Sequence, residues 1–184
     1  MTLYEFEGKK PLVREGSYVF ESADVVGNVR IGKGCYVGPG ARIRGDYGRI
    51  EVGNFTAIED NVVVHARPDD VTTIGSHVTI GHGAVIHNAT VKDWSVIGMG
   101  AIVSDWAEVG VWGVVAEGAV IKNHDKIPDG KVAMGVPAKV VADVDEHFKA
   151  AWTSFKEIYV QLASKRYPES LRKMPKGKAE NPDK

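Results

Sequence analysis

The chain has 184 residues, enough for one domain with a sizeable core, and its charges nearly cancel at a net −1. This balance excludes the basic excess that is typical of nucleic-acid-binding proteins, and the single cysteine, Cys35, excludes an intrachain disulfide. No apolar stretch is long enough to span a bilayer and Met1–Leu12 lacks a signal-peptide pattern, so we expect a soluble, cytoplasmic protein with no nucleic-acid or membrane partner.

A six-residue repeat covers residues 26–127, in which an aliphatic residue recurs at every sixth position and glycine often follows it. Its registers run Ile31–Val37–Ile43, Val52–Ile58–Val64, Ile74–Ile80–Ile86 and, at the same step, from Val91 to Ile127. The 3.6-residue period of a helix cannot produce this spacing, whereas a short strand and a tight bend can. We therefore predict an all-β fold, a parallel β-helix of triangular cross-section with three units per turn. The alternative is an up-and-down barrel with coincidental spacing.

The repeat is interrupted at four places, where the register slips after Val26, Ile43, Val64 and Ile86. Interruptions of a solenoid become loops on one side, which is often the working side. Three units per turn place Arg44, His65 and His87 in one column. The same count stacks Asp60 with His82 on a different face.

His65 and His87 are candidate metal ligands. Adjacent coils lie about 4.8 Å apart, so both imidazoles can reach one ion at about 2.0–2.1 Å. His82 lies off this face and would join them only from a neighbouring chain, if the prisms pack side by side as a trimer. Three neutral imidazoles leave an open coordination position, which is typical of a catalytic zinc. We interpret the remaining histidines, His77, His124 and His147, as solvated or hydrogen-bonded side chains. We interpret Cys35 as a small coil residue.

The segment 143–167 changes character, because its apolar residues fall at three- and four-residue spacing. They are Phe148, Ala151, Trp152, Phe155, Ile158, Tyr159 and Leu162. We predict an amphipathic helix with Asp143 or Asp145 as its N-cap and Pro168 at its end. The expected organisation is a β-helix over 1–142, a helix over 143–168 that packs on the coil or on a neighbour, and a disordered tail over 169–184.

Four stretches of the chain resemble the γ-class carbonic anhydrases of the hexapeptide-repeat superfamily. They are IRGDYGRI at 43–50, IEDNVVVH at 58–65, IGHGAVIH at 80–87 and MGVPAKV at 134–140. The resemblance runs from about residue 10 to the terminal helix, and the subgroup encoded in phenylacetate or carnitine operons is the most similar. It implies a left-handed β-helix, a homotrimer, and a zinc, iron or cobalt ion at each subunit interface. The ligands that it implies are His65, His82 and His87.

Other residues match the family's motifs one by one. Arg44 and Asp46 match its Arg-x-Asp, which shapes the interface near the metal, and Asp60 matches the Asp of its Gln-Asp pair. Tyr159 is our candidate for the tyrosine by which the terminal helix of many relatives reaches the site. Two alternatives stay open: Arg44 with Asp46 or Asp60 forms only an ion pair that orders a trimer, and Tyr159 only packs the helix.

The sequence also departs from the family. Ala57 and Glu59 stand where the family often has Asn and Gln, and the acidic proton-shuttle loop is absent. Glu59 can still accept a hydrogen bond from an attacking water, although it adds charge near the metal. We expect hydration of carbon dioxide to bicarbonate with Zn²⁺, Fe²⁺ or Co²⁺. The alternatives are a hexapeptide acyl- or acetyltransferase that uses coenzyme A, and a metal-binding homologue without turnover.

Overall fold

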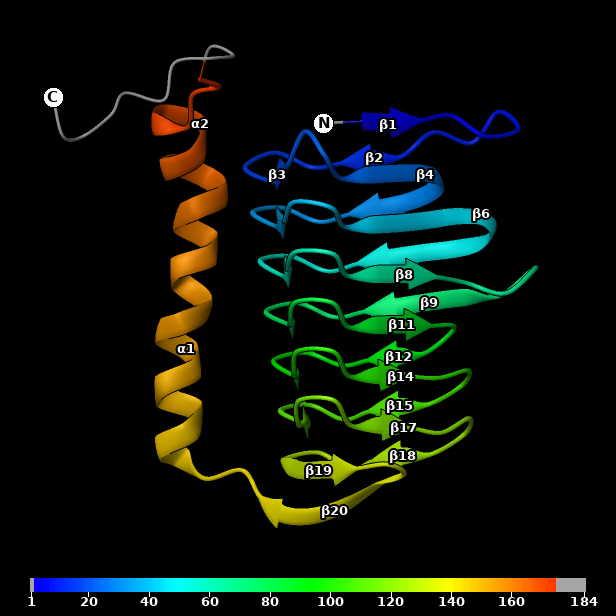
Figure 1. Ribbon diagram of the computed structural model, residues 1–184, viewed down its shortest axis with the longest axis vertical. Coiled ribbons are helices and arrows are strands. Elements are labelled where there is room, and N and C mark those ends of the chain that lie inside the picture. The colour runs from blue at the N-terminus through cyan, green and yellow to red at the C-terminus, as the bar shows by residue number, and fades with distance from the viewer. Residues whose placement is uncertain (1, 175–184) are drawn as a thin grey trace, which may run out of the picture.

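Strand pairing in the computed structural model, which describes residues 2–174, follows the predicted interval of three repeat units per turn. Ile74 pairs with Val91, Val91 with Val109, and Val109 with Ile127. The result is a parallel β-solenoid of about seven turns with a helical segment beside it (Figure 1). The predicted all-β fold class, a hexapeptide β-helix with a C-terminal helix, is confirmed.

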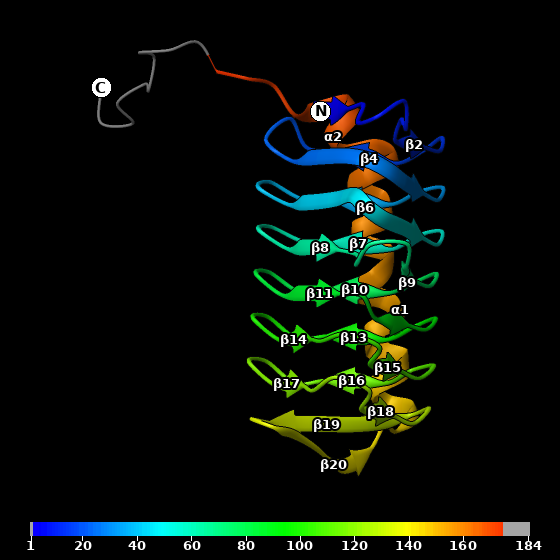
Figure 2. The ribbon, with the colours of Figure 1, turned by 90° about the vertical axis from the view of Figure 1, so that its right-hand side faces the viewer.

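The strands stack coil on coil into three faces (Figure 2). Two long strands, β4 Asp24–Ile31 and β6 Arg42–Val52, bend so that each contributes to two faces. The first face adds β1 Thr2–Tyr4, β8 Val63–His65, β11 Val85–His87, β14 Ile102–Val103 and β17 Val120–Ile121. The second face adds β2 Leu12–Val13, β9 Val71–Ile74, β12 Thr90–Val91, β15 Glu108–Val109 and β18 Lys126–Ile127. The third face consists of β3 Tyr18–Val19, β5 Tyr36–Val37, β7 Ala57–Ile58, β10 Thr79–Ile80, β13 Val96–Ile97, β16 Val114–Val115, β19 Lys131–Gly135 and the antiparallel β20 Ala138–Asp143.

The inward positions form a continuous apolar core along the solenoid. Ile97 is fully buried and stacks between Ile80 of the preceding coil and Val115 of the next. Backbone hydrogen bonds join adjacent coils, so the polar groups of each strand are satisfied by its neighbours. Cys35 is buried among these coils, and its thiol donates to the Gly53 carbonyl at 3.0 Å. Its predicted role as a small coil residue is confirmed.

The first predicted interruption of the repeat is wrong. Val25 is fully buried and pairs with Ile43, whereas Val26 pairs with Arg44 and points outward. The inward positions Val25 and Ile31 are six residues apart, so the register holds there. Two adjacent valines fit the pattern equally well, and only the pairing of the strand decides which one faces the core.

The helical segment consists of α1 Glu146–Gln161, the π-helical turn η1 Leu162–Arg166 and α2 Tyr167–Ser170. Asp145, one of the two predicted N-caps, accepts a hydrogen bond from the Phe148 amide at 2.7 Å. Asp143 instead ends β20, so the helix begins later than predicted. The predicted end at Pro168 is wrong, because Pro168 lies within α2. The wider turn of η1 just before it changes the carbonyl positions that otherwise clash with a proline ring.

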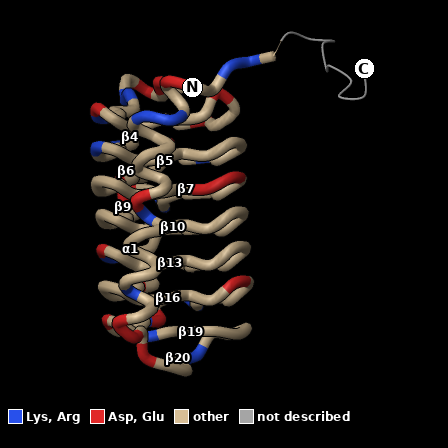
Figure 3. Tube along the Cα trace, turned by 90° about the vertical axis from the view of Figure 1, so that its left-hand side faces the viewer, with Lys and Arg blue, Asp and Glu red and all other residues tan. Residues whose placement is uncertain are grey.

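The helix lies along the third face of the coil (Figure 1), where Tyr159 packs against Tyr36 at 5.2 Å between ring centroids. Figure 3 shows few charged residues on the strands of this face and an acidic stretch at the bend after β7. Phe155 and Ile158, which the pattern places on the packed side, are exposed. Lys156 is buried instead. The apolar stripe is therefore wider than the strip of helix that contacts the coil.

Two of the histidines outside the candidate site pack against tryptophans at the bends. His77 stacks on Trp94 with ring centroids 4.1 Å apart, and His124 stacks on Trp106 at 4.9 Å. The predicted tail begins within α2, and its residues 175–184 lie outside the described part of the chain. The division into domains at 1–142, 143–168 and 169–184 stays a prediction. No helix among the described residues is long and apolar enough to cross a membrane.

Candidate metal centre

The predicted column of polar residues on the first face is present. Arg44 in β6 pairs with His65 in β8, and His65 pairs with His87 in β11. The side chains of this pair are also in contact, since Nδ1 of His65 lies 3.1 Å from Nε2 of His87. Because both residues directly follow a buried aliphatic residue of their strands, the regular coil places their rings in adjacent coils. The predicted stacking of the two histidines is confirmed.

Each of these imidazoles has its own carboxylate partner. Asp46 Oδ1 lies 2.9 Å from His65 Nε2, and Asp105 Oδ1 lies 2.5 Å from His87 Nδ1. Burial alone would raise the pKa of Asp46, but hydrogen bonds from His65 and its ion-pair partner Arg44 hold that pKa below its ordinary value. The hydrogen bond from Arg67 is the main cause of a lowered pKa at Asp105. Both carboxylates are therefore ionised acceptors at neutral pH.

The donor set of this pair fits a metal ion. A neutral imidazole carries one N–H, and each ring directs one nitrogen to a carboxylate that can only accept. The remaining nitrogens, Nδ1 of His65 and Nε2 of His87, then present lone pairs to each other across 3.1 Å. Two facing lone pairs repel unless a proton or a metal cation lies between them. An ion at about 2.0–2.1 Å from both nitrogens fits this separation.

His82 lies elsewhere, at the bend that follows β10. Its Nε2 is 3.1 Å from Glu59 Oε2 and its Nδ1 is 3.5 Å from Asp60 Oδ2, so the predicted stacking of Asp60 with His82 is confirmed. The His82 side chain is 46% exposed, which leaves it open to a neighbour. Within residues 2–174, no cluster of three His, Cys, Asp or Glu is arranged to hold a metal ion in one chain. A three-histidine site would therefore need a second copy of the chain.

Glu59 is the buried acid of this bend. Only 6% of the residue is exposed, and it accepts hydrogen bonds from the His82 amide, at 3.2 Å, and from the Tyr159 side chain. Burial is the main cause of the raised pKa of Tyr159, and the hydrogen bond with Glu59 adds to it. Tyr159 thus approaches the bend from α1 and packs the helix against Tyr36 as well, while its part in the site stays a prediction.

Lys156 is a buried cation that the sequence pattern did not indicate. Its Nζ donates to Thr79 Oγ1 at 3.0 Å and to the Ser95 carbonyl at 3.2 Å. Burial lowers its pKa to about 7, against a smaller opposite effect of Glu59. A lysine between apolar helix positions is usually solvated, so only the packing of α1 reveals this one.

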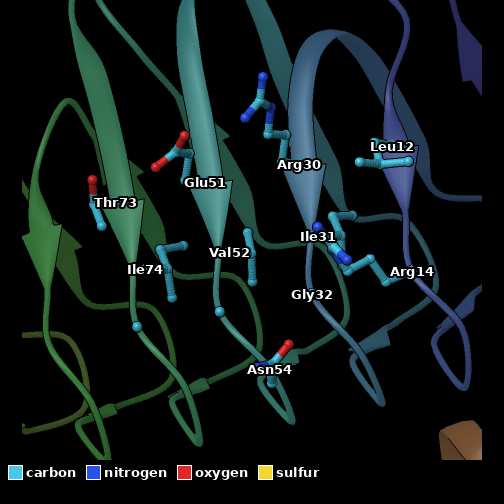
Figure 4. A pocket seen from close by; sticks show the side chains of 12 residues that line it. Leu12, Arg14, Arg30, Ile31, Gly32, Glu51, Val52, Asn54, Thr73 and Ile74 are labelled. Atoms are coloured by element: carbon cyan, nitrogen blue, oxygen red, sulfur yellow. The ribbon is translucent and has the colours of Figure 1, made fainter.

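Two hollows lie on different faces of the solenoid. The groove between α1 and the third face reaches Glu59 and His82 at one end, and its walls are largely apolar, with Val96, Met99 and Trp152 among them. A separate cleft on the second face is lined by both apolar and charged residues, with Leu12, Arg30 and Glu51 among them (Figure 4). None of the residues predicted for the site lines this second cleft. Of these two hollows, the groove beside α1 is the one that adjoins Glu59 and His82.

Asp105 and Arg67 are the site residues that sequence reasoning missed. Val103 pairs with Ile86, so a count of coils could have placed Asp105 beside the column of His87. No such count reaches Arg67, because it belongs to the loop inserted after β8, whose path the repeat does not determine. The structure thus brings together Arg44, Asp46, His65 and His87, and adds Asp105 and Arg67 to them.

Comparison with known proteins finds similar sequences and similar solved structures, although no protein-family model matches the chain. The chain is 38% identical over 172 residues to γ-carbonic anhydrase 2, mitochondrial, of Arabidopsis thaliana, and the match covers 90% of this chain and 59% of that protein. It is 36% identical over 146 residues to carnitine operon protein CaiE of Proteus sp., covering 79% of this chain and 74% of that one. Among solved structures, a hexapeptide transferase family protein from Anaplasma phagocytophilum aligns with a TM-score of 0.84 at 33% identity, over 88% of this chain and 96% of that one.

Proposed function

Because the chain belongs to the γ-class carbonic anhydrase-like family of hexapeptide-repeat proteins, we propose that it is a metal-dependent enzyme that hydrates carbon dioxide to bicarbonate. The ligands are His65 and His87 of one subunit and His82 of the partner subunit in a homotrimer. The ion is Zn²⁺, with Fe²⁺ or Co²⁺ as alternatives, and the enzyme works in the cytoplasm. The chain spans 59% of the plant relative's length, so the activity of that protein is transferred here only as a proposal.

The observation that carries the proposal is the pair of imidazole nitrogens that face each other at 3.1 Å. Asp46 and Asp105 occupy the other nitrogen of each ring, so the facing nitrogens are free to bind a cation. Carboxylate partners of this kind fix the tautomer and raise the basicity of histidine ligands in metal sites. His82 would supply the third imidazole by exchanging the contact of its Nε2 with Glu59 Oε2, 3.1 Å away in the single chain, for the ion. One coordination position would then stay open for chemistry.

When bound, such an ion would lower the pKa of water from about 15.7 toward 7 and so would supply a nucleophile at neutral pH. Glu59 accepts a hydrogen bond from the attacking water and orients it toward the carbon atom of carbon dioxide. Tyr159 holds Glu59 by donating a hydrogen bond to it. Asp60 borders Nδ1 of His82, with its amide nitrogen at 3.3 Å and its Oδ2 at 3.5 Å. Arg44, paired with Asp46, contributes a positive charge beside the site at which the bicarbonate anion forms.

The test is to purify the protein anaerobically, load it with zinc or iron, and measure both bound metal and carbon dioxide hydration. We expect close to one metal ion per subunit and hydration above the rate of the metal-free protein. Metal at that level without hydration would contradict the enzymatic proposal and favour a metal-binding homologue without turnover.

A second candidate function is acyl or acetyl transfer from coenzyme A. It is favoured by the similarity, at 33% identity, to a hexapeptide transferase family protein from Anaplasma phagocytophilum. Such an enzyme needs one histidine as a base rather than three ligands. Little bound metal together with acyl transfer from acetyl coenzyme A would favour this function over the first.

A further inference from the structure

The loop at residues 66–70, inserted after β8, is fixed to the bend that follows β11. The Arg67 amide donates to Asn88 Oδ1 at 3.0 Å, and Asn88 Nδ2 donates to Asp70 Oδ2 at 2.8 Å. Trp106 Nε1 donates to the same Asp70 oxygen at 2.9 Å. Asn88 is only 2% exposed, so water has little access to its two bonds. The loop therefore holds its first residues in a defined place beside the histidine column.

Arg67 uses this position to reach Asp105, on a coil farther along the solenoid. Its guanidinium donates to Asp105 Oδ2 at 2.6 Å and lies 5.1 Å from the centre of the Trp106 ring. The indole face and the carboxylate together restrict the planar guanidinium to one orientation. The contact thus fixes the direction of the Asp105 carboxylate as well.

The two oxygens of Asp105 have different partners. Oδ2 accepts from Arg67, while Oδ1 lies 2.5 Å from His87 Nδ1. The Asp105 side chain is 9% exposed, so water competes little for either oxygen. An ionised carboxylate only accepts hydrogen bonds, so the imidazole nitrogen that faces it must carry the proton.

We propose that Asp105, held by Arg67, is a positioning residue that keeps the proton of His87 on Nδ1 and directs the lone pair of Nε2 toward His65. Without this carboxylate, His87 would be free to carry its proton on Nε2 and to turn its ring. The inserted loop then has a purpose, since it delivers the arginine that fixes the carboxylate. The expected effect on metal binding rests on the proposed function, whereas the tautomer of His87 does not.

The first experiment compares Asp105→Asn with Asp129→Asn. An amide cannot accept from Arg67 and His87 at once, so Asp105→Asn should weaken zinc binding by about 10- to 100-fold in competition with a chelator. Asp129→Asn removes the carboxylate of another bend, where it accepts from the Val111 amide at 2.8 Å. It should leave zinc affinity within about twofold of the original chain, even if both variants lower the melting temperature. Equal losses in the two variants would overturn the proposal, because they would indicate a general effect on stability.

The second experiment needs no metal. ¹⁵N NMR of the metal-free protein with labelled histidine, at about pH 8, reports which nitrogen of His87 is protonated. We expect Nδ1–H in the original chain and in Asp129→Asn, and a mixture of tautomers in Asp105→Asn and, to a smaller degree, in Arg67→Gln. Arg67→Gln keeps the test valid if Asp105→Asn does not fold. An unchanged tautomer in both variants overturns the proposal. A changed tautomer in a protein that binds no zinc supports it and instead contradicts the proposed metal function.

Discussion

The coils from Val91 to Ile127 and the coils from Ile43 to Ile86 share one core but differ in what surrounds it. In the first region the repeat runs without interruption, and apolar residues stack inward from coil to coil. In the second region two insertions break the repeat, after Ile43 and after Val64. The ion pair of Arg44 with Asp46, the ring of His65 and the guanidinium of Arg67 all adjoin these insertions.

The difference shows that insertions can add polar residues to the surface of a solenoid while its apolar core stays continuous. Ile43 and Val64 stay fully buried beside the insertions, so the apolar stack is continuous through both regions. Only the outward residues and the bends change. Stability and binding should therefore be separable by mutation, because each depends on a different layer of the same coils.

The largest expected effect is on binding, in the interrupted region. His82→Ala should abolish metal binding as fully as His65→Ala, because a site with two imidazoles loses a necessary ligand. The measurement is metal content after zinc loading and gel filtration. His77→Ala is the control, since His77 stacks on Trp94 at another bend and its loss should leave metal content unchanged. Metal retained by His82→Ala would show that the interface arrangement is wrong.

A large effect on stability with none on binding is expected in the regular region. Ile97→Ala removes a fully buried side chain between Ile80 and Val115 and should lower the free energy of unfolding by about 2–5 kcal/mol. Urea unfolding measures this change, and zinc titration of the folded variant should give the affinity of the original chain. A variant that keeps its stability but loses zinc affinity would contradict the separation of the two layers.

The sequence alone predicts most of the regular region and part of the interrupted one. The six-residue register and the count of three units per turn predict the fold and the pairing of His65 with His87, because a repeat fixes which residues stack. The choice between Val25 and Val26 fails, since both fit the pattern. Arg67 is missed because insertions follow no periodicity.

The terminal helix was predicted less well than the coil. Its apolar spacing identifies a helix but does not tell which side contacts the third face, where Phe155 of the stripe is exposed and Lys156 is buried. Helix continuation through Pro168 depends on the π-helical turn before it, and no residue pattern indicated that turn. The carboxylate of Asp105 beside His87 is a tertiary contact that a search for family motifs does not find.

A smaller, pH-dependent effect is expected where the helix meets the coil. The pKa of Lys156 is about 7 in the folded chain and close to its ordinary value of 10.5 when unfolded. The unfolded state therefore binds more protons between these values, and the free energy of unfolding should rise with pH there, by at most about 1.4 kcal/mol per pH unit. Two titratable neighbours are coupled to this lysine: Glu59 acts to raise the pKa of Lys156, and the charge of Lys156 lowers the pKa of His77.

Lys156→Met checks this effect, because methionine fills a similar space without a charge. Urea unfolding between about pH 7 and pH 9 should give a rising free energy for the original chain and a flatter one for the variant. Lys149→Met, on the same helix but paired at the surface with Glu146, is the control and should keep the rise. An equal slope in Lys156→Met and the original chain would contradict the buried, neutral lysine.

The shared site is tested most directly by mixing two variants that cannot bind metal on their own. His65→Ala keeps His82 intact, and His82→Ala keeps the pair of His65 and His87, so a mixed trimer contains one interface with all three imidazoles. With random mixing of equal amounts, we expect about a quarter of the metal content of the original protein, whereas each variant alone should hold almost none. Mixed trimers that form but bind no metal would contradict a site built from two subunits.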